Sequence, residues 1–373
     1  MKYYLIAGEA SGDLHGSNLI KELLKKDPKA EIRFWGGDLM QQEGGMLVKH
    51  YKELAFMGFV EVILHLKTIL NNLSFCKKDL EAFMPDVIIF IDYPGFNLRI
   101  AKWAKAKGFV THYYISPQIW AWKENRIKAI KRDIDKMYVI LPFEKSYYEE
   151  KHNFPVHFVG HPLMDAIENY KHQNNNLENF KEEHQLDNRP IIALLPGSRK
   201  QEISKSLSIF KELTNTYPNY QFVIAGAPSI TDAFYQQISK GTGIKHISNQ
   251  TYALLSHADA ALVTSGTATL ETALFEVPQV VCYKGNTISY WIAKQVVKLK
   301  YISLVNLIMN QAVVKELIQD DFDIKQLQEE LDALLNPKNR AKIITDYKKL
   351  KDKLGGGGAS KEVANLILKN IKT

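Results

Sequence analysis

The sequence has few of the features that mark a secreted or membrane-spanning protein. It contains only two cysteines, Cys76 and Cys282, which lie far apart in apolar or helical patterns. This spacing argues against a disulfide framework and against a cysteine metal site. The chain has no apolar run of about 18 residues, the length that a membrane-spanning helix needs. Its first residues, MKYYLIAGEASGD, turn polar too early for a signal peptide. We therefore expect a cytoplasmic protein.

Concentrated charge and metal-ligand spacing are also missing. The net charge is +7, but Lys and Arg are scattered and form no basic run of the kind that binds nucleic acid. The histidines show no H-E-x-x-H or other ligand spacing, and no carboxylate cluster suggests a metal cage. We expect no nucleic-acid partner, no metal and no cofactor. A basic surface still suits anionic lipid or a phosphorylated small molecule.

Short apolar runs rich in β-formers alternate with amphipathic helical stretches along the whole chain. This alternation is typical of parallel sheets that are covered by helices on both faces. The sequence therefore predicts an α/β fold with two Rossmann-like domains that face a cleft. The predicted strands are 3–7, 32–35, 87–92, 110–116, 137–141 and 156–159 in the first half, and 191–195, 221–225, 244–247, 260–264 and 279–283 in the second.

A polar, Asn-rich segment at 168–189 indicates the linker between the two domains. We expect one domain over 1–168 and another over 189–339. Helical patterns fill the tail, and four consecutive glycines, Gly355–Gly358, provide a flexible break. The C-terminal helix, from about 340 to 373, can then return to complete the first domain. It could also exchange between subunits and so form a homodimer.

Two segments of the first domain suggest a substrate site. GEASGDLHG at 8–16 follows the first strand, and Gly8, Ser11 and Asp13 lie where a ligand could approach a helix start. The segment is not G-x-G-x-x-G, so it is weak support for a dinucleotide, and it could be a simple turn. Asp92 ends the apolar strand in PDVIIFIDYPGFN, where burial would make it a general base. Its alternative role is to cap the next helix or to bond the turn that Pro94 and Gly95 make.

Two tryptophans follow the next strand, in ISPQIWAWKENR at 115–126. Trp120 and Trp122 could stack on a sugar or an acyl chain. They could equally pack between helices as part of the core.

The second domain carries two turns suited to phosphate. In LLPGSRKQEI at 194–203, a strand ends at a Pro-Gly-Ser turn that leads into a helix, and this turn holds Ser198 and Arg199. A helix start and a guanidinium favour anions, although the arginine could also lie on a solvated loop. In TSGTATLETALFEVP at 264–278, Glu271 lies in the helix and could accept ribose hydroxyls, or else lie on the surface. That helix starts at Ser265, Gly266 and Thr267.

The segment GFVEVILHLKTIL at 58–70 is apolar on more than one face, which exceeds what a surface helix needs. It is either a deeply buried helix or a patch that touches lipid. The residues that carry this excess are Val60, Val62, Ile63, Leu66, Ile69 and Leu70.

Ten segments together resemble the lipid-A-disaccharide synthase family, and they follow the family order over nearly the whole length. These segments are AGEASGD, ELAFMGFVEV, PDVIIFIDYPGFN, ISPQIWAWKENR, LPFEKSYYE, FVGHPLMD, LPGSRKQEI, SGTATLE, YISLVNL and GASKEVA. The resemblance implies a GT-B glycosyltransferase fold and chemistry that needs no metal. It also implies that Asp92, Arg199 and Asn306 are catalytic. Two positions depart from the family pattern, Gly95 and His15, and the first weakens any mechanism with a second acid at that turn.

The resemblance further implies an inverting hexosyltransferase of lipid A biosynthesis. It would join UDP-2,3-diacylglucosamine to 2,3-diacylglucosamine 1-phosphate and release the β-1,6 disaccharide 1-phosphate and UDP. Residues 265–271 would hold the nucleotide, and 58–70 would dip into the cytoplasmic face of the inner membrane. Two alternatives remain open: a UDP-N-acetylglucosamine 2-epimerase-like enzyme of the same architecture, and a non-enzymatic sugar-binding protein. A nicotinamide dehydrogenase lacks support because the glycine fingerprint is missing.

Overall fold

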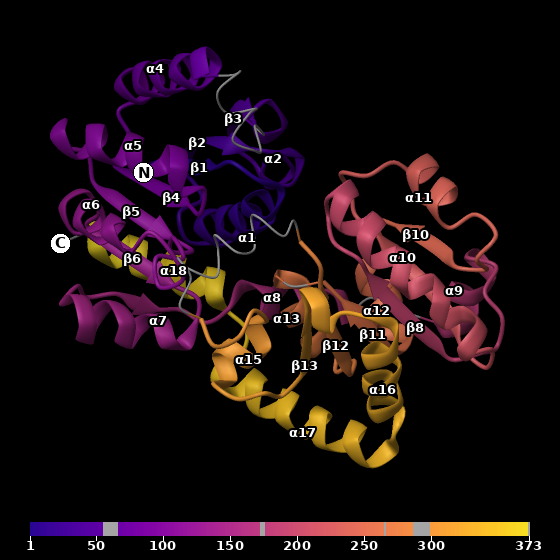
Figure 1. Cartoon of the computed structure of the whole chain (residues 1–373). Helices are drawn as coiled ribbons and strands as arrows, with labels where there is room; N and C mark the ends of the chain where they lie inside the picture. The colour runs from indigo at the N-terminus through magenta and orange to yellow at the C-terminus, as the bar shows by residue number, and fades with distance from the viewer. Residues whose placement is uncertain (55–65, 172–175, 265, 286–298, 372–373) are drawn as a thin grey trace. The chain divides into compact units, whose positions relative to one another are not determined.

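The computed structural model describes residues 1–54, 66–171, 176–264, 266–285 and 299–371, which form two compact units (Figure 1). One unit comprises Met1–Asp165 with Leu354–Thr373, and the other comprises Ala166–Lys353. Each unit is built on one parallel sheet with helices around it, so the predicted α/β class with two Rossmann-like domains is confirmed. None of the helices in the described ranges is long and apolar enough to cross a membrane.

The first unit contains a seven-stranded sheet in the order β3-β2-β1-β4-β5-β6-β7. All neighbouring strands in it are parallel. The two central strands are buried along almost their whole length, which explains why they appear in the sequence as continuous apolar runs. The strands are β1 (Lys2–Ala7), β2 (Glu31–Gly36), β3 (Met46–His50), β4 (Val87–Ile91), β5 (Thr111–Tyr114), β6 (Lys136–Val139) and β7 (His157–Phe158).

Helices cover this sheet, and α4 and α5 supply much of the core cluster on one face. A short 3-10 helix, η2 (Glu124–Arg126), and a π-helix, η3 (Tyr147–Lys151), complete the loops after β5 and β6. The helices of this part of the chain are α1 (Ala10–Lys26), α2 (Asp38–Glu43), α4 (Leu66–Phe83), α5 (Pro94–Ala106), α6 (Ile127–Asp133), α7 (Pro142–Ser146) and α8 (Pro162–Lys171).

The last helix, α18 (Ala359–Ile371), returns to the first unit and packs on α1, as the yellow ribbon among indigo and magenta elements shows in Figure 1. Asp165 caps it by accepting hydrogen bonds from the backbone N–H groups of Gly358 and Ser360. The return begins at Leu354. The sequence led us to expect that the chain returns to the first domain from about residue 340. The preceding helix, α17 (Pro337–Lys353), instead packs on helices of the second unit.

The second unit contains a six-stranded parallel sheet in the order β10-β9-β8-β11-β12-β13. Its strands are β8 (Ile191–Leu195), β9 (Gln221–Gly226), β10 (Lys245–Ser248), β11 (Ala258–Val263), β12 (Gln279–Tyr283) and β13 (Lys315–Ile318). Its helices are α9 (Leu177–Glu183), α10 (Lys200–Thr216), α11 (Asp232–Ile238), α12 (Thr251–His257), α13 (Thr267–Leu274), α15 (Leu304–Met309), α16 (Ile324–Leu335) and α17.

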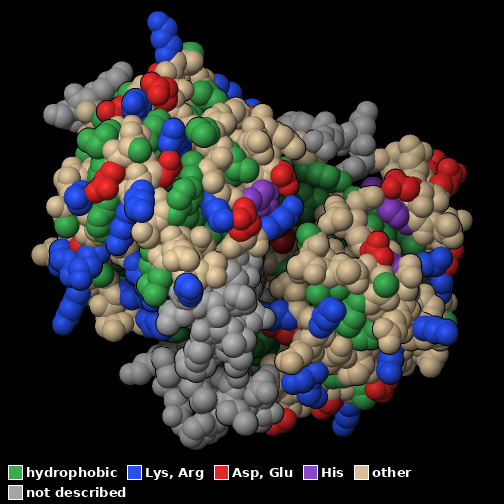
Figure 2. Space-filling model, turned by 90° about the horizontal axis from the view of Figure 1, so that it is seen from above, with side chains coloured by type: hydrophobic (Ala, Val, Ile, Leu, Met, Phe, Trp, Pro, Cys, Tyr) green, Lys and Arg blue, Asp and Glu red, His purple; other side chains and the backbone are tan. Residues whose placement is uncertain are grey.

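Each predicted strand is present, but the edge strands β3 and β13 were not predicted. Both are short, and most of their residues are partly exposed and include charged side chains. Such composition protects a sheet edge from unwanted pairing, and it also removes the apolar run by which a strand is recognised in sequence. On the face drawn in Figure 2, Lys and Arg side chains are interspersed with Asp and Glu and do not gather into one basic patch.

Both sheets reverse their strand order once. In the first, the chain builds outward from β1 to β3 and then continues from β4 on the other side of β1. In the second, the reversal lies between β8 and β11. Ligands of open α/β sheets bind beyond the carboxyl ends of the strands at such a reversal, because the two following loops diverge there. We therefore expect a ligand site at each of the two reversals.

Candidate functional site

The reversal in the first unit brings Gly8 and Asp92 together. Gly8 directly follows β1 and Asp92 directly follows β4, and the last paired residues of these strands are Ala7 and Ile91. The backbone at Asp92 is left-handed, with φ 44°, and so is that of Tyr93, with φ 48°. Two consecutive non-glycine residues in this region cost about 1–3 kcal/mol each. Strain of this kind persists only where surrounding contacts enforce it.

Buried polar side chains enforce this turn. The Asp92 carbonyl accepts hydrogen bonds from Asn97 Nδ2 at 2.7 Å and from the Tyr113 hydroxyl at 2.5 Å. Asn97 Nδ2 also lies 3.3 Å from the carbonyl oxygens of Ile6 and Ile91, so one amide ties the ends of β1 and β4 to the turn. The position of Asp92 is thus set before any ligand binds.

The environment of Asp92 suits a general base. Burial raises the pKa of this carboxyl to about 6, and the nearby charges of Glu9 and Glu144 act in the same direction. A hydrogen bond from the backbone of Tyr93 opposes them. A base with a pKa close to the working pH is ionised yet still takes up a proton readily. The helix-capping alternative receives no support, because the N-cap residue of α5 is Tyr93.

Glu144 was assigned no role from the sequence, yet it organises the loop after β5. It is buried, and burial raises the pKa of its carboxyl. Its oxygens accept from Ser116 Oγ at 2.5 Å and Trp120 Nε1 at 3.1 Å, and also from the backbone N–H groups of Ile140 and Leu141. The available signal was its position in the first turn of a helix that begins with proline directly after a strand.

The two tryptophans have different surroundings. Trp120 is partly buried, with its ring edge-on to Phe143 at 4.9 Å and its indole N–H on Glu144. Trp122 is 45% exposed, and Lys123 Nζ lies 4.0 Å from the centroid of its ring. Trp120 is therefore anchored within the unit, whereas Trp122 is presented to solvent.

The predicted site residues that follow β1 also differ in exposure. Gly8 is buried against the ring of Tyr93, and Ser11 is exposed in the first turn of α1. Asp13 is buried, and its carboxylate accepts from the backbone N–H groups of three residues at the start of α2: Gly37, Leu39 and Met40. Asp13 thus fixes α2 beside α1, which is a positioning role with respect to any ligand.

In the second unit, the turn at 196–199 (PGSR) follows β8 at the reversal of the sheet. Gly197 has a left-handed φ of 108°, and a Cβ there would lie 2.9 Å from Glu202 Oε2. Ser198 and Arg199 then lead into α10. The Arg199 side chain is 67% exposed and donates to Glu202 Oε1 at 2.8 Å. Two features that favour anions, a helix start and a guanidinium, thus meet here.

The second turn of this reversal follows β11, beside β8. Ser265 lies outside the described residues. Gly266 adopts φ 115° with open space around it, and Thr267 is exposed at the start of α13. Further along α13, Glu271 accepts from the Tyr252 hydroxyl at 3.1 Å, and burial raises the pKa of its carboxyl. The turn therefore offers helix N–H groups with a sheltered carboxylate one turn further on.

Asn306 is 1% exposed and uses all of its amide groups internally. Its Nδ2 donates to the Val314 carbonyl at 2.8 Å and to Glu316 Oε1 at 2.9 Å. Its Oδ1 accepts from the backbone N–H groups of Val313 and Val314. An amide can make four such bonds, so none remains for a substrate. Asn306 thus holds the backbone at Val313 and Val314 and the side chain of Glu316.

Much of the apolar segment at 58–70 lies outside the described residues, including Val60, Val62 and Ile63. Leu66 starts α4, and nothing is described of its side chain. Ile69 is partly buried against the core of the first unit, and Leu70 is 54% exposed. The described end of the segment thus has one core-facing and one solvent-facing residue.

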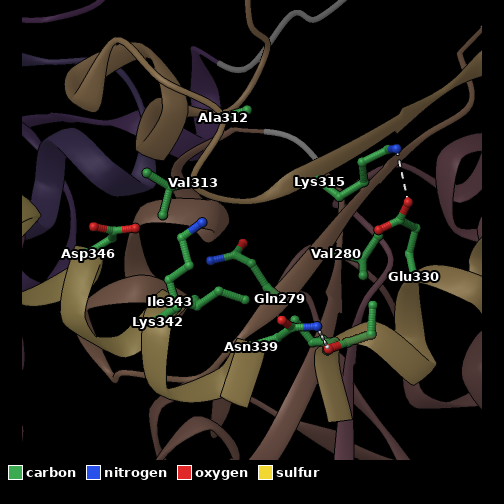
Figure 3. A pocket seen from close by; sticks show the side chains of 12 residues that line it. Gln279, Val280, Ala312, Val313, Lys315, Glu330, Asn339, Lys342, Ile343 and Asp346 are labelled. Carbon is green, nitrogen blue, oxygen red and sulfur yellow. Dashed lines mark hydrogen bonds and ion pairs between the residues drawn. The ribbon is translucent and has the colours of Figure 1, made fainter. Parts of the chain in front are cut away.

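A cavity of about 220 Å³ in the second unit lies at the opposite edge of the sheet (Figure 3). Gln279 and Lys315, which line it, are the first residues of β12 and β13. Lys315 forms an ion pair with Glu330 across its rim, at 2.9 Å. Since ligands of such sheets bind at the carboxyl ends, this cavity is separate from the candidate site.

A family model for "Lipid-A-disaccharide synthetase" matches residues 3–369. A lipid-A-disaccharide synthase from Geobacter metallireducens is 37% identical over 98% of this chain and 96% of its own length. One from Coxiella burnetii is 38% identical over 97% and 96%. Among solved structures, a UDP-GlcNAc 2-epimerase from Neisseria meningitidis bound to UDP-GlcNAc has a TM-score of 0.70, with 16% identity and coverage of 99% and 100%. A glycosyltransferase of kitacinnamycin has a TM-score of 0.65, with 14% identity and coverage of 99% and 98%. The last two show the shared fold.

Gly8→Ala tests the packing beneath the candidate base. The new Cβ would lie 2.2–2.6 Å from three ring atoms of Tyr93, so the ring must move. We expect a loss of about 1–3 kcal/mol in the free energy of unfolding, measured by urea denaturation with tryptophan fluorescence. Gly95→Ala is the matched control, because it lies in α5 with nothing within 4 Å and should be neutral or stabilising. Equal stability of the two variants would contradict the packing described.

Proposed function

The chain belongs to the lipid-A-disaccharide synthetase family, and on that premise we propose that it joins UDP-2,3-diacylglucosamine to 2,3-diacylglucosamine 1-phosphate with inversion at the anomeric carbon. It is a glycosyltransferase, a hexosyltransferase of lipid A biosynthesis. The proposed products are the β-1,6-linked disaccharide 1-phosphate and UDP. The observation that carries the proposal is the partly buried, strained Asp92 at the reversal of the first sheet, where an acceptor hydroxyl can be deprotonated.

We assign the acceptor to the first unit. The ionised Asp92 carboxylate takes the proton of the acceptor 6-hydroxyl as that oxygen attacks the anomeric carbon of the donor. The bond between the anomeric carbon and the diphosphate oxygen breaks on the opposite face, and its electron pair leaves with UDP. One displacement inverts the configuration and needs no covalent intermediate on the protein.

We assign the UDP portion of the donor to the second unit. The starts of α10 and α13 lie at the same reversal, and N–H groups at a helix start stabilise anions. Arg199 adds a forked donor that can exchange its bond to Glu202 for diphosphate oxygens. Negative charge grows on the leaving group during displacement, so these groups bind the transition state more tightly than the ground state. In this proposal Glu271, whose carboxylate accepts a hydrogen bond from Tyr252, accepts the ribose hydroxyls.

We further propose that the start of α4 docks on the cytoplasmic face of the inner membrane, where acylated substrates lie. Leu70 and Phe75 are exposed apolar residues on this helix, and Lys67 and Lys78 are exposed cations near them. Exposed apolar residues among cations suit an anionic bilayer surface. Asn306, with no free amide group, acts in this scheme as a positioning residue.

A transfer assay tests the function. The purified protein is mixed with both diacylated substrates in detergent micelles, and the products are analysed by mass spectrometry. We expect a disaccharide phosphate and an equal amount of UDP. Turnover of the UDP-sugar without an acceptor would instead favour a 2-epimerase, and the absence of turnover with intact binding would favour a sugar-binding protein.

Arg199→Ala should slow this transfer by about tenfold to a thousandfold, since one donor to the leaving group is lost. The guanidinium is exposed, so the fold should persist, which circular dichroism can check. Lys211→Ala removes one positive charge from the exposed side of the same helix and should leave the rate unchanged. A normal rate for Arg199→Ala would remove this residue from the mechanism.

The pH profile of kcat/KM tests Asp92. Because the folded pKa of Asp92 is raised to about 6, the carboxyl is protonated below that pH and cannot accept the hydroxyl proton. The rate should fall as the pH drops through about 6.

Asp92→Asn should lower kcat by at least about a hundredfold. Glu9→Gln removes a charge that raises this pKa, so it should move the acidic limb to lower pH. An Asp92→Asn enzyme with near-normal kcat would assign the base elsewhere.

Leu70→Glu tests the membrane surface. It removes exposed apolar area and adds a negative charge, so co-sedimentation with phosphatidylglycerol vesicles should weaken by at least about tenfold. Asn71→Glu adds the same charge at the neighbouring exposed position and removes no apolar area. Its effect should be clearly smaller. If the two variants behave alike, charge alone governs binding and Leu70 does not insert.

A further inference from the structure

Lys123 and Arg126 place two cations at one exposed tryptophan. Lys123 Nζ lies 4.0 Å and Arg126 Cζ 5.7 Å from the centroid of the Trp122 ring. Within the described ranges, neither cation forms an ion pair. Glu124, the carboxylate between them, forms an ion pair with Lys151 at 2.5 Å, and its Oε1 lies 3.1 Å from His152 Nε2. The cluster therefore has positive charge that no carboxylate of its own segment neutralises.

The loop that carries this cluster is held firmly. The hydroxyls of Tyr148 and Tyr147 donate to the backbone carbonyls of Pro117 at 3.2 Å and Ile119 at 3.3 Å. The backbone of Lys123 is left-handed, with φ 55°, although lysine has no intrinsic preference for that region. A strained residue on an anchored loop, with its side chain exposed, indicates that the presentation of this cation is specified.

The cluster lies on the loop that follows the strand next to that of the candidate base. The loop leaves the carboxyl end of β5, the strand next to β4. The Tyr113 hydroxyl donates to the Asp92 carbonyl at 2.5 Å. Burial and the charge of Asp92 raise the pKa of Tyr113, and the charge of Arg126 opposes this rise, so Arg126 is within electrostatic range of that hydroxyl. Arg126 thus acts electrostatically on the hydroxyl that helps to hold the turn of Asp92.

We propose that Lys123 and Arg126 bind the phosphate monoester of the acceptor, with Trp122 as the surface between them. This inference rests on the proposed function and adds the residues that select a phosphorylated acceptor. A phosphate dianion matches two adjacent cations in charge, and the guanidinium fork matches phosphate oxygens in geometry. Burial and the like charge of Arg126 lower the pKa of Lys123 in the free protein, and a bound dianion would remove that penalty.

Kinetics with paired acceptors test the inference. 2,3-Diacylglucosamine 1-phosphate and the same molecule without its phosphate are compared on the wild type, Lys123→Gln and Arg126→Gln. We expect each variant to raise KM for the phosphorylated acceptor by about tenfold to a hundredfold, with kcat changed by less than about threefold. KM for the unphosphorylated acceptor should change by less than about twofold. Lys128→Gln, an exposed cation on α6, is the matched control and should affect neither acceptor.

The outcomes separate this inference from the proposed function. A wild type that makes no disaccharide from either acceptor would overturn the proposed function. A wild type that is active, with variants that are weakened equally on both acceptors, would overturn the phosphate assignment alone. Vesicles of phosphatidylglycerol distinguish the other source of phosphate. If the variants lose vesicle binding in the absence of acceptor and keep the wild-type ratio of KM values, the cations bind lipid headgroups and the assignment is wrong.

Discussion

The reversal of strand order in each parallel sheet is the constraint on which the candidate chemistry depends. Where the order reverses, two neighbouring strands send their loops to opposite faces, and the space between the loops is left to polar side chains and helix starts. In the first unit these strands are β1 and β4, and in the second they are β8 and β11. Asp92 and Arg199 both follow strands at a reversal. Residue type alone would not single out either of them, and their topological position makes them candidates for a site.

The two reversals favour opposite charges. The first gathers carboxylates, and burial with mutual repulsion raises the pKa of Asp92, so its proton affinity approaches what a base needs. The second gathers helix starts and a guanidinium, which favour an anion. A displacement with a phosphate leaving group needs both kinds of environment, a proton acceptor for the nucleophile and positive potential for the leaving group. The proposed assignment of the acceptor to one unit and of the leaving group to the other follows from this difference.

The sequence predicted the architecture well, because buried parallel strands are continuous apolar runs and each polar turn follows directly after one. It was weaker wherever a side chain contacts something distant in sequence. Asp13 and Asn306 were predicted as site residues by motif, and the structure adds that Asp13 bonds backbone at Gly37 and that Asn306 bonds backbone at Val314 and the side chain of Glu316. Glu144 was passed over because its partners, Ser116 and Trp120, lie about one strand and helix earlier in the chain. A polar side chain can form hydrogen bonds to a ligand or to the backbone, and only the folded structure shows which partner it has.

Backbone strain at non-glycine residues could not be predicted from the sequence. Asp92, Tyr93, Ile115 and Lys123 all have left-handed φ values, and all lie after the carboxyl ends of β4 and β5. None is glycine, and a β-branched residue such as Ile115 is among the least suited to this region. A motif cannot reveal such a cost, because it is imposed by buried partners such as Asn97 and Tyr113. Four of the eleven non-glycine residues with left-handed φ in the described ranges thus follow two neighbouring strands, at the edge where the candidate base lies. Relaxing the strain would stabilise the unit and loosen the site.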